Sequence, residues 1–536
     1  MNKKILSLAV VLVMVLVLGA CQSPAPSPAA EATKAPAAAT AAPAADDTAD
    51  AEEEAPVEPT SELDPYELTW YMYCAKSSDQ ATVIAEELNK TLTEKFNATV
   101  NIVMISGGDW NDKALPPLRA GEKIDIFWTP EWMGFANNLA SNLLLPLNDP
   151  AGPAGDLIAQ YGPQTLVDMG DFVAANLVDG KLYTVSTIKE LCVPGGLIWN
   201  KKLVDKYDID IAKVQDIASL NEVLATFEEA EEFKAGGFYP LAHAGSFTFI
   251  EPYIQGFLNN MSAIVIRIGE PNANTAVPEI AWYSDEYKEY TAAAKEWTDK
   301  KYTHPDNYLR SFLLDDHINA GQFLVATNFV LKGGQVKSKE LMAASGNPDL
   351  EMIEVQTSAS VNVTTHAGGS MWGIPITSKD PARAMMLLNE LYQNTDFLNT
   401  VVWGVEGVHN NVVSPGVRQA VDMNGWTDSM GGAWTMGNQL KQDIGPNEDP
   451  EKYAQMAALT AEAWGHESLG YRFWDQPAHD GVYVAYKNWA DTYERAFKTG
   501  VNLDQWDAAM AELKAIGIDD LLTVIQENYA AWKAAK

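Results

Sequence analysis

The chain has 536 residues, and its 72 acidic and 37 basic side chains leave a formal net charge of −35. This length is too great for a single hydrophobic core and suffices for two or more lobes. The charge argues against nucleic acid and anionic polymers as partners, because binding them requires clustered Lys and Arg. Neutral or cationic ligands suit this chain better.

Residues 1–20 have the pattern of a signal peptide. Lys3 and Lys4 precede an apolar run over 5–18 that is too short to span a bilayer comfortably, and small residues then lead to Cys21. This arrangement resembles the lipobox of bacterial lipoproteins, which implies that the signal is removed and that Cys21 is the lipidation site. Two or three acyl chains anchor a protein stably. The alternative, an ordinary secretory signal with an incidental cysteine, also predicts export.

Residues 21–64 are predicted to form a disordered acidic linker. The segment is rich in Ala and Pro and has no aromatic side chain, so it cannot bury enough surface to offset its chain entropy. Charge repulsion and proline keep it extended, and at roughly 3 Å per residue it spans on the order of 100 Å. A tether of this length favours a Gram-positive host, with the protein at the extracellular face of the cell membrane.

Folded sequence is predicted to begin near residue 65 with a strand, a helix and a strand. Residues 67–74 and 99–105 are rich in β-preferring side chains, and apolar residues recur at every fourth position between 84 and 96. Helix N-caps are available at 77–79. Such a βαβ unit should be parallel and right-handed.

Later elements indicate an α/β organisation throughout. A helical segment at 109–119, broken by Pro116 and Pro117, leads to a third strand at 124–128. Further strands are predicted at 196–200, 321–330 and 373–376, and helices at 220–235, at 381–392 and over most of 481–532. No second apolar run of membrane-spanning length follows the signal.

Five motifs in order resemble the solute-binding proteins of ABC importers, in particular the large lipoprotein branch of family 1, the group that includes maltose-binding protein. They are GKLY at 180–183, GLIWNK at 196–201, GIP with SKDP at 373–381, WGVEGVH at 403–409, and the segment 499–519.

The resemblance implies an α/β type II periplasmic-binding-protein fold, with two lobes joined by a hinge and closing on ligand. We expect lobe 1 to comprise residues 65–190 and 365–412, and lobe 2 to comprise 191–364 and 413–536. It also implies a monomer without catalytic activity or cofactor, which captures a small molecule and delivers it to ABC permease subunits.

Candidate ligand-binding residues cluster where strands should end, because ligands of open α/β sheets bind beyond the carboxyl ends of the strands. Trp128, Glu131 and Trp132 follow the third strand, and Trp372, Trp403 and Trp434 also neighbour glycine or charged residues. Aromatic faces suit sugar rings. Trp372 is a candidate through its position beside glycine. The resemblance to maltose-binding protein adds Tyr73, Lys76, Glu251 and Tyr253, and the resemblance to the family adds Asn328 and Trp474 as contacts from the second lobe.

Carbohydrate, in particular an oligosaccharide, is therefore the preferred ligand. A peptide-binding or sensor lipoprotein of the same fold is the first alternative, and a surface glycoside hydrolase, which needs two carboxylates about 5–9.5 Å apart, is the second. The sequence contains no HExxH, GxSxG or P-loop motif, and its histidines show no metal-ligand spacing. Glu406 and His409 are interpreted as structural. Whether Cys74 and Cys192 form a disulfide stays open at this point.

Overall fold

A computed structural model describes residues 63–74, 78–192, 194–247, 249–250, 252–254, 261–308, 313–422, 425–426, 433–473 and 476–536. The signal, Cys21 and nearly all of the predicted linker lie outside these residues. Within the described part of the chain, no helix has both the length and the apolarity needed to cross a bilayer.

The predicted strand–helix–strand unit is confirmed. Strand β1 (Tyr66–Cys74) and strand β2 (Ala98–Ser106) pair in parallel along their whole length. Helix α2 (Ala81–Phe96) connects them and buries Ile84, Leu88 and Leu92. The predicted N-caps are wrong, because the helix begins after Gln80 without a side-chain cap, and Ser78 instead accepts a hydrogen bond from the Gln80 N–H.

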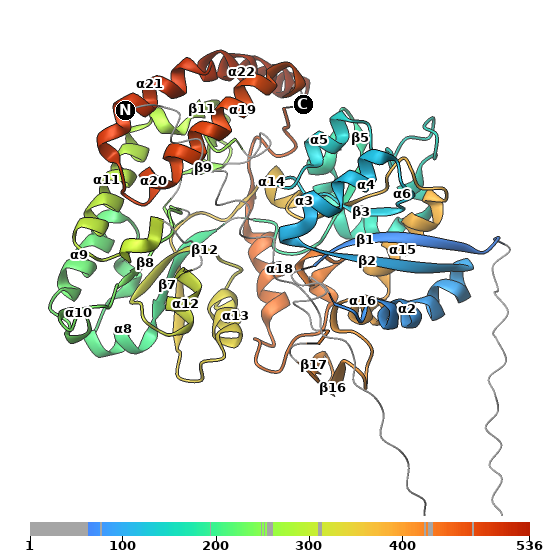
Figure 1. The fold of residues 1–536 in the computed structure, drawn as a ribbon, viewed down its shortest axis with the longest axis horizontal. Coiled ribbons are helices and arrows are strands. Elements are labelled where there is room, and N and C mark those ends of the chain that lie inside the picture. The colour runs from blue at the N-terminus through green and yellow to red at the C-terminus, as the bar shows by residue number, and fades with distance from the viewer. Residues whose placement is uncertain are drawn as a thin grey trace, which may run out of the picture. The chain divides into compact units, whose positions relative to one another are not determined.

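The first sheet has five strands in the order β2-β1-β3-β15-β6. Strand β3 (Ile126–Trp128) is parallel to β1, whereas β15 (Met371–Gly373) is antiparallel to both β3 and β6 (Thr184–Ser186). Helices α3 (Trp110–Lys113) and α4 (Leu115–Ala120) lie on one side of the sheet, and α2 and α16 (Thr395–Trp403) lie on the other (Figure 1). The helix break falls at Ala114 rather than at the two prolines, which occupy the first turn of α4, where a missing N–H costs nothing.

A buried carboxylate joins distant parts of this first lobe. Asp125 is fully buried and accepts hydrogen bonds from the Tyr66 hydroxyl (2.7 Å), the Thr69 N–H (2.8 Å) and the Ser378 hydroxyl (2.6 Å). These bonds fix β1 and the start of β3 to the turn that precedes helix α15 (Pro381–Gln393). The hydrophobic core around them also draws in Trp372, from the returning part of the chain.

The second sheet has the order β13-β7-β12-β8. Strand β7 (Gly195–Asn200) is antiparallel to β12 (Val325–Val330) and β13 (Met352–Gln356), and β8 (Leu241–Ala242) is parallel to β12. Gly196 is required here, because a Cβ at this position would come within 2.4 Å of the Val355 carbonyl oxygen. Helices beside this sheet are α8 (Lys201–Tyr207), α9 (Ile217–Phe227), α10 (Glu231–Lys234), α12 (Leu313–Asn319) and α13 (Val336–Ser345).

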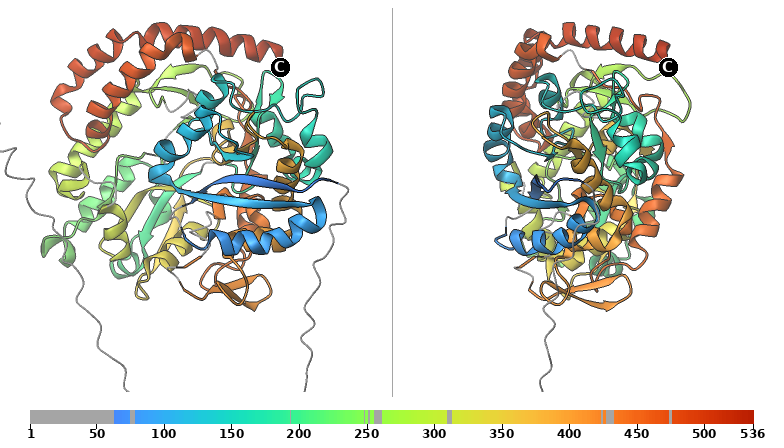
Figure 2. Two further views of the ribbon diagram at one scale, coloured as in Figure 1. Left: turned by 45° about the vertical axis from the view of Figure 1, so that its right-hand side comes forward. Right: turned by 90° about the vertical axis from the view of Figure 1, so that its right-hand side faces the viewer.

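The C-terminal helices complete the second core, as the periodicity of 481–532 predicts. Helix α19 (Asp480–Trp489) passes through a π-helical turn, Ala490–Glu494, into α20 (Arg495–Lys498), and α21 (Trp506–Ala515) and α22 (Ile518–Ala535) follow. They lie beside α11 and a small antiparallel sheet (Figure 2). These neighbouring elements are α11 (Asp285–Asp299), β9 (Tyr253–Ile254), β10 (Ile264–Arg267) and β11 (Pro278–Ile280).

The remaining elements are short, apart from α18 (Lys452–Glu462). They are α5 (Phe135–Ala140), α6 (Leu157–Tyr161), α7 (Pro163–Met169), α14 (Thr364–Ala367), the pair β4 (Leu177–Val178) and β5 (Lys181–Leu182), the pair β14 (Val361–Asn362) and β18 (Trp464–Gly465), and the hairpin of β16 (Asn410–Ser414) and β17 (Val417–Ala420).

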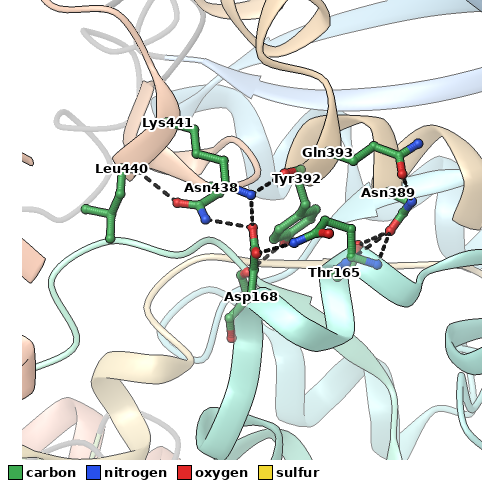
Figure 3. A network of polar contacts seen from close by, with 10 residues as sticks. Thr165, Asp168, Asn389, Tyr392, Gln393, Asn438, Leu440 and Lys441 are labelled. Atoms are coloured by element: carbon green, nitrogen blue, oxygen red, sulfur yellow. Dashed lines mark hydrogen bonds and ion pairs between the residues drawn. The ribbon is translucent and has the colours of Figure 1, made fainter.

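Packing suggests one change to the proposed lobe division. Asp168 on α7 accepts hydrogen bonds from the side chains of Asn438 and Lys441, both at 2.7 Å, and Lys441 also donates to the Tyr392 carbonyl of α15 (Figure 3). Met436 lies in the first core as well. We therefore propose that residues 433–442 belong to lobe 1, and the other predicted boundaries stay a proposal.

Candidate ligand-binding cavity

A cavity of about 830 Å³ lies between residues of the two cores. One wall comes from α4 and the β3–α5 segment of the first lobe, and it includes Trp132 and Asn138. The other wall comes from α19, its π-helical turn and residues 261–262 of the second lobe. The volume of the cavity is in the range of cavities that enclose small molecules.

Four aromatic side chains form a cluster at the first wall. Because β1 and β3 are parallel neighbours, their carboxyl ends bring Tyr73 and Trp128 together, with ring centroids 3.9 Å apart. Trp132 and Trp434 each meet Trp128 edge to face, at 5.5 and 6.0 Å, and their own planes are within 27° of each other. Trp128 is fully buried and Trp132 is 40% exposed, so Trp132 presents the cluster to the cavity.

The cluster is held by the chain segment that returns to the first sheet at β15. The Trp128 indole N–H donates to the Ser370 hydroxyl (3.0 Å), and the Trp132 indole N–H donates to the Gly369 carbonyl (2.8 Å). The Glu131 backbone N–H donates to the Gly368 carbonyl at 2.9 Å. The aromatic cluster is therefore fixed to residues 368–370 at three successive positions.

The second wall presents a compact polar group. The Ser262 hydroxyl lies 2.6 Å from the Tyr486 hydroxyl and 2.8 Å from a Glu494 carboxylate oxygen, and the Tyr486 hydroxyl donates to the other Glu494 oxygen at 3.1 Å. Burial disfavours the charge of Glu494, but the Lys498 ammonium at 2.7 Å and the hydroxyl donors outweigh it, so the pKa of Glu494 is lowered. The group therefore offers an anionic acceptor beside two hydroxyls.

Sequence reasoning did not find this polar group. Glu494 is the last residue of the π-helical turn, which interrupts the ordinary spacing of the helix, and such turns recur at functional sites. Ser262 is distant from Glu494 in the sequence, and a single serine matches no sequence motif that would predict a binding site. Asn138, also missed, is buried on the first wall, and its side-chain oxygen has no hydrogen-bond partner among the described residues.

Of the predicted site residues whose side chains are described, only Trp132 lines the cavity; Tyr73 and Trp128 lie behind it in the aromatic cluster, and three others lie elsewhere. Glu131 is buried in an ion pair with Arg472. Trp372 is fully buried, and its indole N–H donates to the Thr435 carbonyl at 2.6 Å. Tyr253 is 5% exposed, and its hydroxyl accepts a hydrogen bond from Arg267 at 2.6 Å.

The other predicted contacts cannot be placed on either wall. Lys76, Glu251 and Trp474 lie outside the described residues. Asn328 lies on β12, and only its backbone is described. Ligand contact by these four residues stays a prediction.

His409, for which the sequence predicts a structural role, lies at the C-terminal end of α16. Its Nδ1 accepts a hydrogen bond from the Val405 N–H at 3.1 Å. A Cβ at Gly404 would come within 2.7 Å of the His409 side chain, so the turn requires glycine. Glu406 lies 3.7 Å from Arg418 of the adjacent hairpin. These contacts brace the turn after α16.

The two described cysteines, Cys74 and Cys192, are free and buried, and burial raises the pKa of both thiols. Over the same described ranges, no group of three or more His, Cys, Asp or Glu side chains is arranged to hold a metal ion.

Comparison with known families supplies the class of protein. The model of the bacterial extracellular solute-binding protein family matches residues 87–404, more than half of the chain. The chain belongs to this family. Membership confirms the predicted role in solute binding rather than catalysis.

Relatives of known function share the fold at low identity. A carbohydrate ABC transporter substrate-binding protein of Streptococcus pneumoniae is 23% identical, over 84% of this chain and 88% of its own. The crystal structure of an N-glycan transport solute binding protein from Streptococcus pneumoniae is 20% identical, covers 88% of this chain and 99% of its own, and has a TM-score of 0.73. An alginate-binding protein without calcium ion is 15% identical with the same coverage and a TM-score of 0.59. These similarities confirm the predicted periplasmic-binding-protein fold.

Proposed function

We propose that this solute-binding protein captures a carbohydrate, in particular an oligosaccharide, and delivers it to the permease of an ABC importer. The observation that carries the proposal is the pairing of an aromatic wall with a polar wall across one cavity of about 830 Å³. Sugars have an apolar C–H face and a polar edge, so this pairing matches them on both sides.

On the first wall, the exposed indole of Trp132 offers a face on which a sugar ring stacks. The Trp128 ring contacts the Trp132 ring, and the Tyr73 ring stacks on Trp128 in turn. The side-chain oxygen of Asn138 is buried and has no hydrogen-bond partner among the described residues, so a ligand hydroxyl that reached it as the lobes close would pair an acceptor that is otherwise costly. These groups make the first wall the stacking side of the site.

On the second wall, the group of Ser262, Tyr486 and Glu494 suits the hydroxyls of the same sugar. Glu494 already accepts from Ser262, Tyr486 and Lys498, and a sugar hydroxyl would bind there by taking the place of one of the two hydroxyl donors. Closure of the lobes around a bound sugar then brings both walls into contact with it. We keep Lys76, Glu251, Asn328 and Trp474 as further candidate contacts.

The relatives support the carbohydrate assignment. One is named as a carbohydrate transporter subunit, and the N-glycan transport protein has also been crystallised in complex with Man5GlcNAc, a structure that matches this chain with a TM-score of 0.66. The importer's permease and ATP-hydrolysing subunits are then the partners. Lipid anchoring through Cys21 at the extracellular face of a Gram-positive membrane and a monomeric state complete the proposal.

Titration calorimetry of the mature protein against a ligand panel tests the proposal. The panel consists of a mannose-rich N-glycan, neutral plant oligosaccharides, alginate oligosaccharides and peptides. We expect binding to at least one saccharide without release of cleavage products, and a decrease in the radius of gyration by X-ray scattering as the lobes close. Binding to peptides with no response to any saccharide would contradict the proposal.

A further inference from the structure

A buried ion pair involves Glu131, the residue that precedes the cavity-lining Trp132. The Arg472 guanidinium contacts the Glu131 carboxylate, and the two side chains are only 3% and 9% exposed. Burial lowers the pKa of Arg472 to about 9, so the guanidinium remains charged at neutral pH beside the carboxylate that pairs with it. Glu131 is thus engaged within the protein rather than open to a ligand.

This pair joins the two hydrophobic cores. The neighbours of Arg472 in sequence, Tyr471 and Phe473, are buried in the second core. Glu131 follows β3, whose Trp128 is buried in the first core. Arg472 is therefore attached to the second lobe and contacts a carboxylate that is attached to the first lobe.

Glu131 and Trp132 are adjacent in the chain and share one support. The backbone of Glu131 and the indole of Trp132 donate to consecutive carbonyls, those of Gly368 and Gly369. Packing around the pair is close, because a Cβ at Gly368 would come within 3.0 Å of the Glu131 carboxylate and 3.2 Å of the Arg472 guanidinium. A shift of Glu131 would therefore also shift Trp132.

We propose that Arg472 is a positioning residue of the binding site, which sets the orientation of Trp132 through its ion pair with Glu131. The inference rests on the proposed function, because Trp132 must be a ligand contact for its orientation to matter. The pair would also connect lobe closure to the stacking surface, since its two members belong to different lobes.

Removing one charge alone would leave the other buried without its opposite charge, which threatens folding. The main variant therefore replaces both, as Glu131→Leu with Arg472→Met, because apolar residues of similar volume often replace a buried pair without loss of stability. A milder variant, Arg472→Lys, keeps the charge but loses the planar guanidinium. The control is Lys95→Met with Glu390→Leu, a pair with a fully buried glutamate that lies within lobe 1 and away from the cavity.

Affinity for the glycan that the wild type binds best is measured for each variant, alone and combined with Trp132→Ala. We expect the double replacement to weaken binding about tenfold in the wild-type background, as contacting residues couple, but less than about threefold in the Trp132→Ala background. Arg472→Lys should also weaken binding more in the wild-type background than in the Trp132→Ala background, with smaller losses of affinity in both. The control pair should change affinity in neither background.

The outcomes separate this inference from the proposed function. Wild-type protein that binds no saccharide would refute both. Binding by the wild type, with an equal loss in the two backgrounds or no loss in either, would overturn only the positioning role of Arg472. If the double replacement fails to fold, the affinity of Arg472→Lys in the wild-type and Trp132→Ala backgrounds tests the positioning role instead.

Discussion

Replacing Trp132 by alanine removes the aromatic face that lines the cavity and leaves the tryptophans behind it in place. Trp132 is 40% exposed, whereas Trp128 is fully buried. The substitution therefore removes surface that is available to a ligand, and the hydrogen bond that it loses, to the Gly369 carbonyl, leaves an acceptor that water can reach.

The size of the effect follows from the exposed surface. A tryptophan side chain presents up to about 250 Å², so its exposed two-fifths amount to about 100 Å². At about 25 cal/mol per Å², full coverage by a sugar ring contributes about 2.5 kcal/mol, which corresponds to about 60-fold in Kd. Partial coverage reduces this figure, so we expect Trp132→Ala to weaken binding between about 10-fold and 60-fold.

Titration calorimetry with the best saccharide of the panel measures the change, and thermal unfolding confirms that each variant is folded. Trp132→Phe keeps a smaller aromatic face and should fall between the wild type and Trp132→Ala. Val167→Ala, at an exposed position on α7 that does not line the cavity, serves as the control and should leave Kd unchanged. A folded Trp132→Ala protein with the affinity of the wild type would refute the stacking argument.

Three further predictions concern stability and reactivity. Burial raises the pKa of Glu354 to about 7 despite the hydrogen bonds that it accepts from Ser338, so between about pH 4.5 and 7 the folded protein keeps a proton that the unfolded protein has released. The free energy of unfolding should therefore fall by at most about 3 kcal/mol as the pH rises through this window. Urea titrations at several pH values measure this fall, and Glu354→Gln should abolish it. Asp125→Ala leaves one buried donor, Ser378, and two partly buried donors without their acceptor and should cost about 3 kcal/mol in the same titrations, whereas a loss below about 1 kcal/mol would contradict the role given to Asp125. Burial raises the pKa of Cys74 to about 11 and of Cys192 to about 12, so neither thiol should react with a disulfide reagent at pH 8 until denaturant is added. Rapid labelling of the native protein would show that these thiols are not buried.

Local pattern was sufficient for the elements whose stability is decided within a few dozen residues. The fourfold spacing of Ile84, Leu88 and Leu92 predicted α2, and the β-rich segments on either side predicted its two strands, because one amphipathic helix and two apolar strands already define a parallel unit. Boundaries were less well determined. The predicted helix at 220–235 is divided into α9 and α10, and the strand at 373–376 begins earlier and ends at Gly373.

The aromatic site was partly predictable for the same kind of reason. The carboxyl ends of parallel strands lie at one edge of a sheet, which favoured Trp128 and Trp132, whereas Tyr73 was a candidate through the family resemblance. That β1 and β3 are neighbours, which brings Tyr73 against Trp128, was decided by the tertiary structure. The contact of Trp434 with Trp128 was not predictable, because nothing in the local sequence of Trp434 ties it to β3.

By itself the sequence determined the α/β character, the family resemblance and the strand ends that carry tryptophan, since each depends on residues close together in the chain. Only the tertiary structure decided that Glu131 pairs with Arg472, that Trp372 is buried, and that Ser262 and Glu494 meet on the opposite wall. The contacts of Glu131 with Arg472 and of Ser262 with Glu494 join residues separated by more than 200 positions. Local pattern cannot specify such pairs, because they form only when the chain has crossed between lobes and returned.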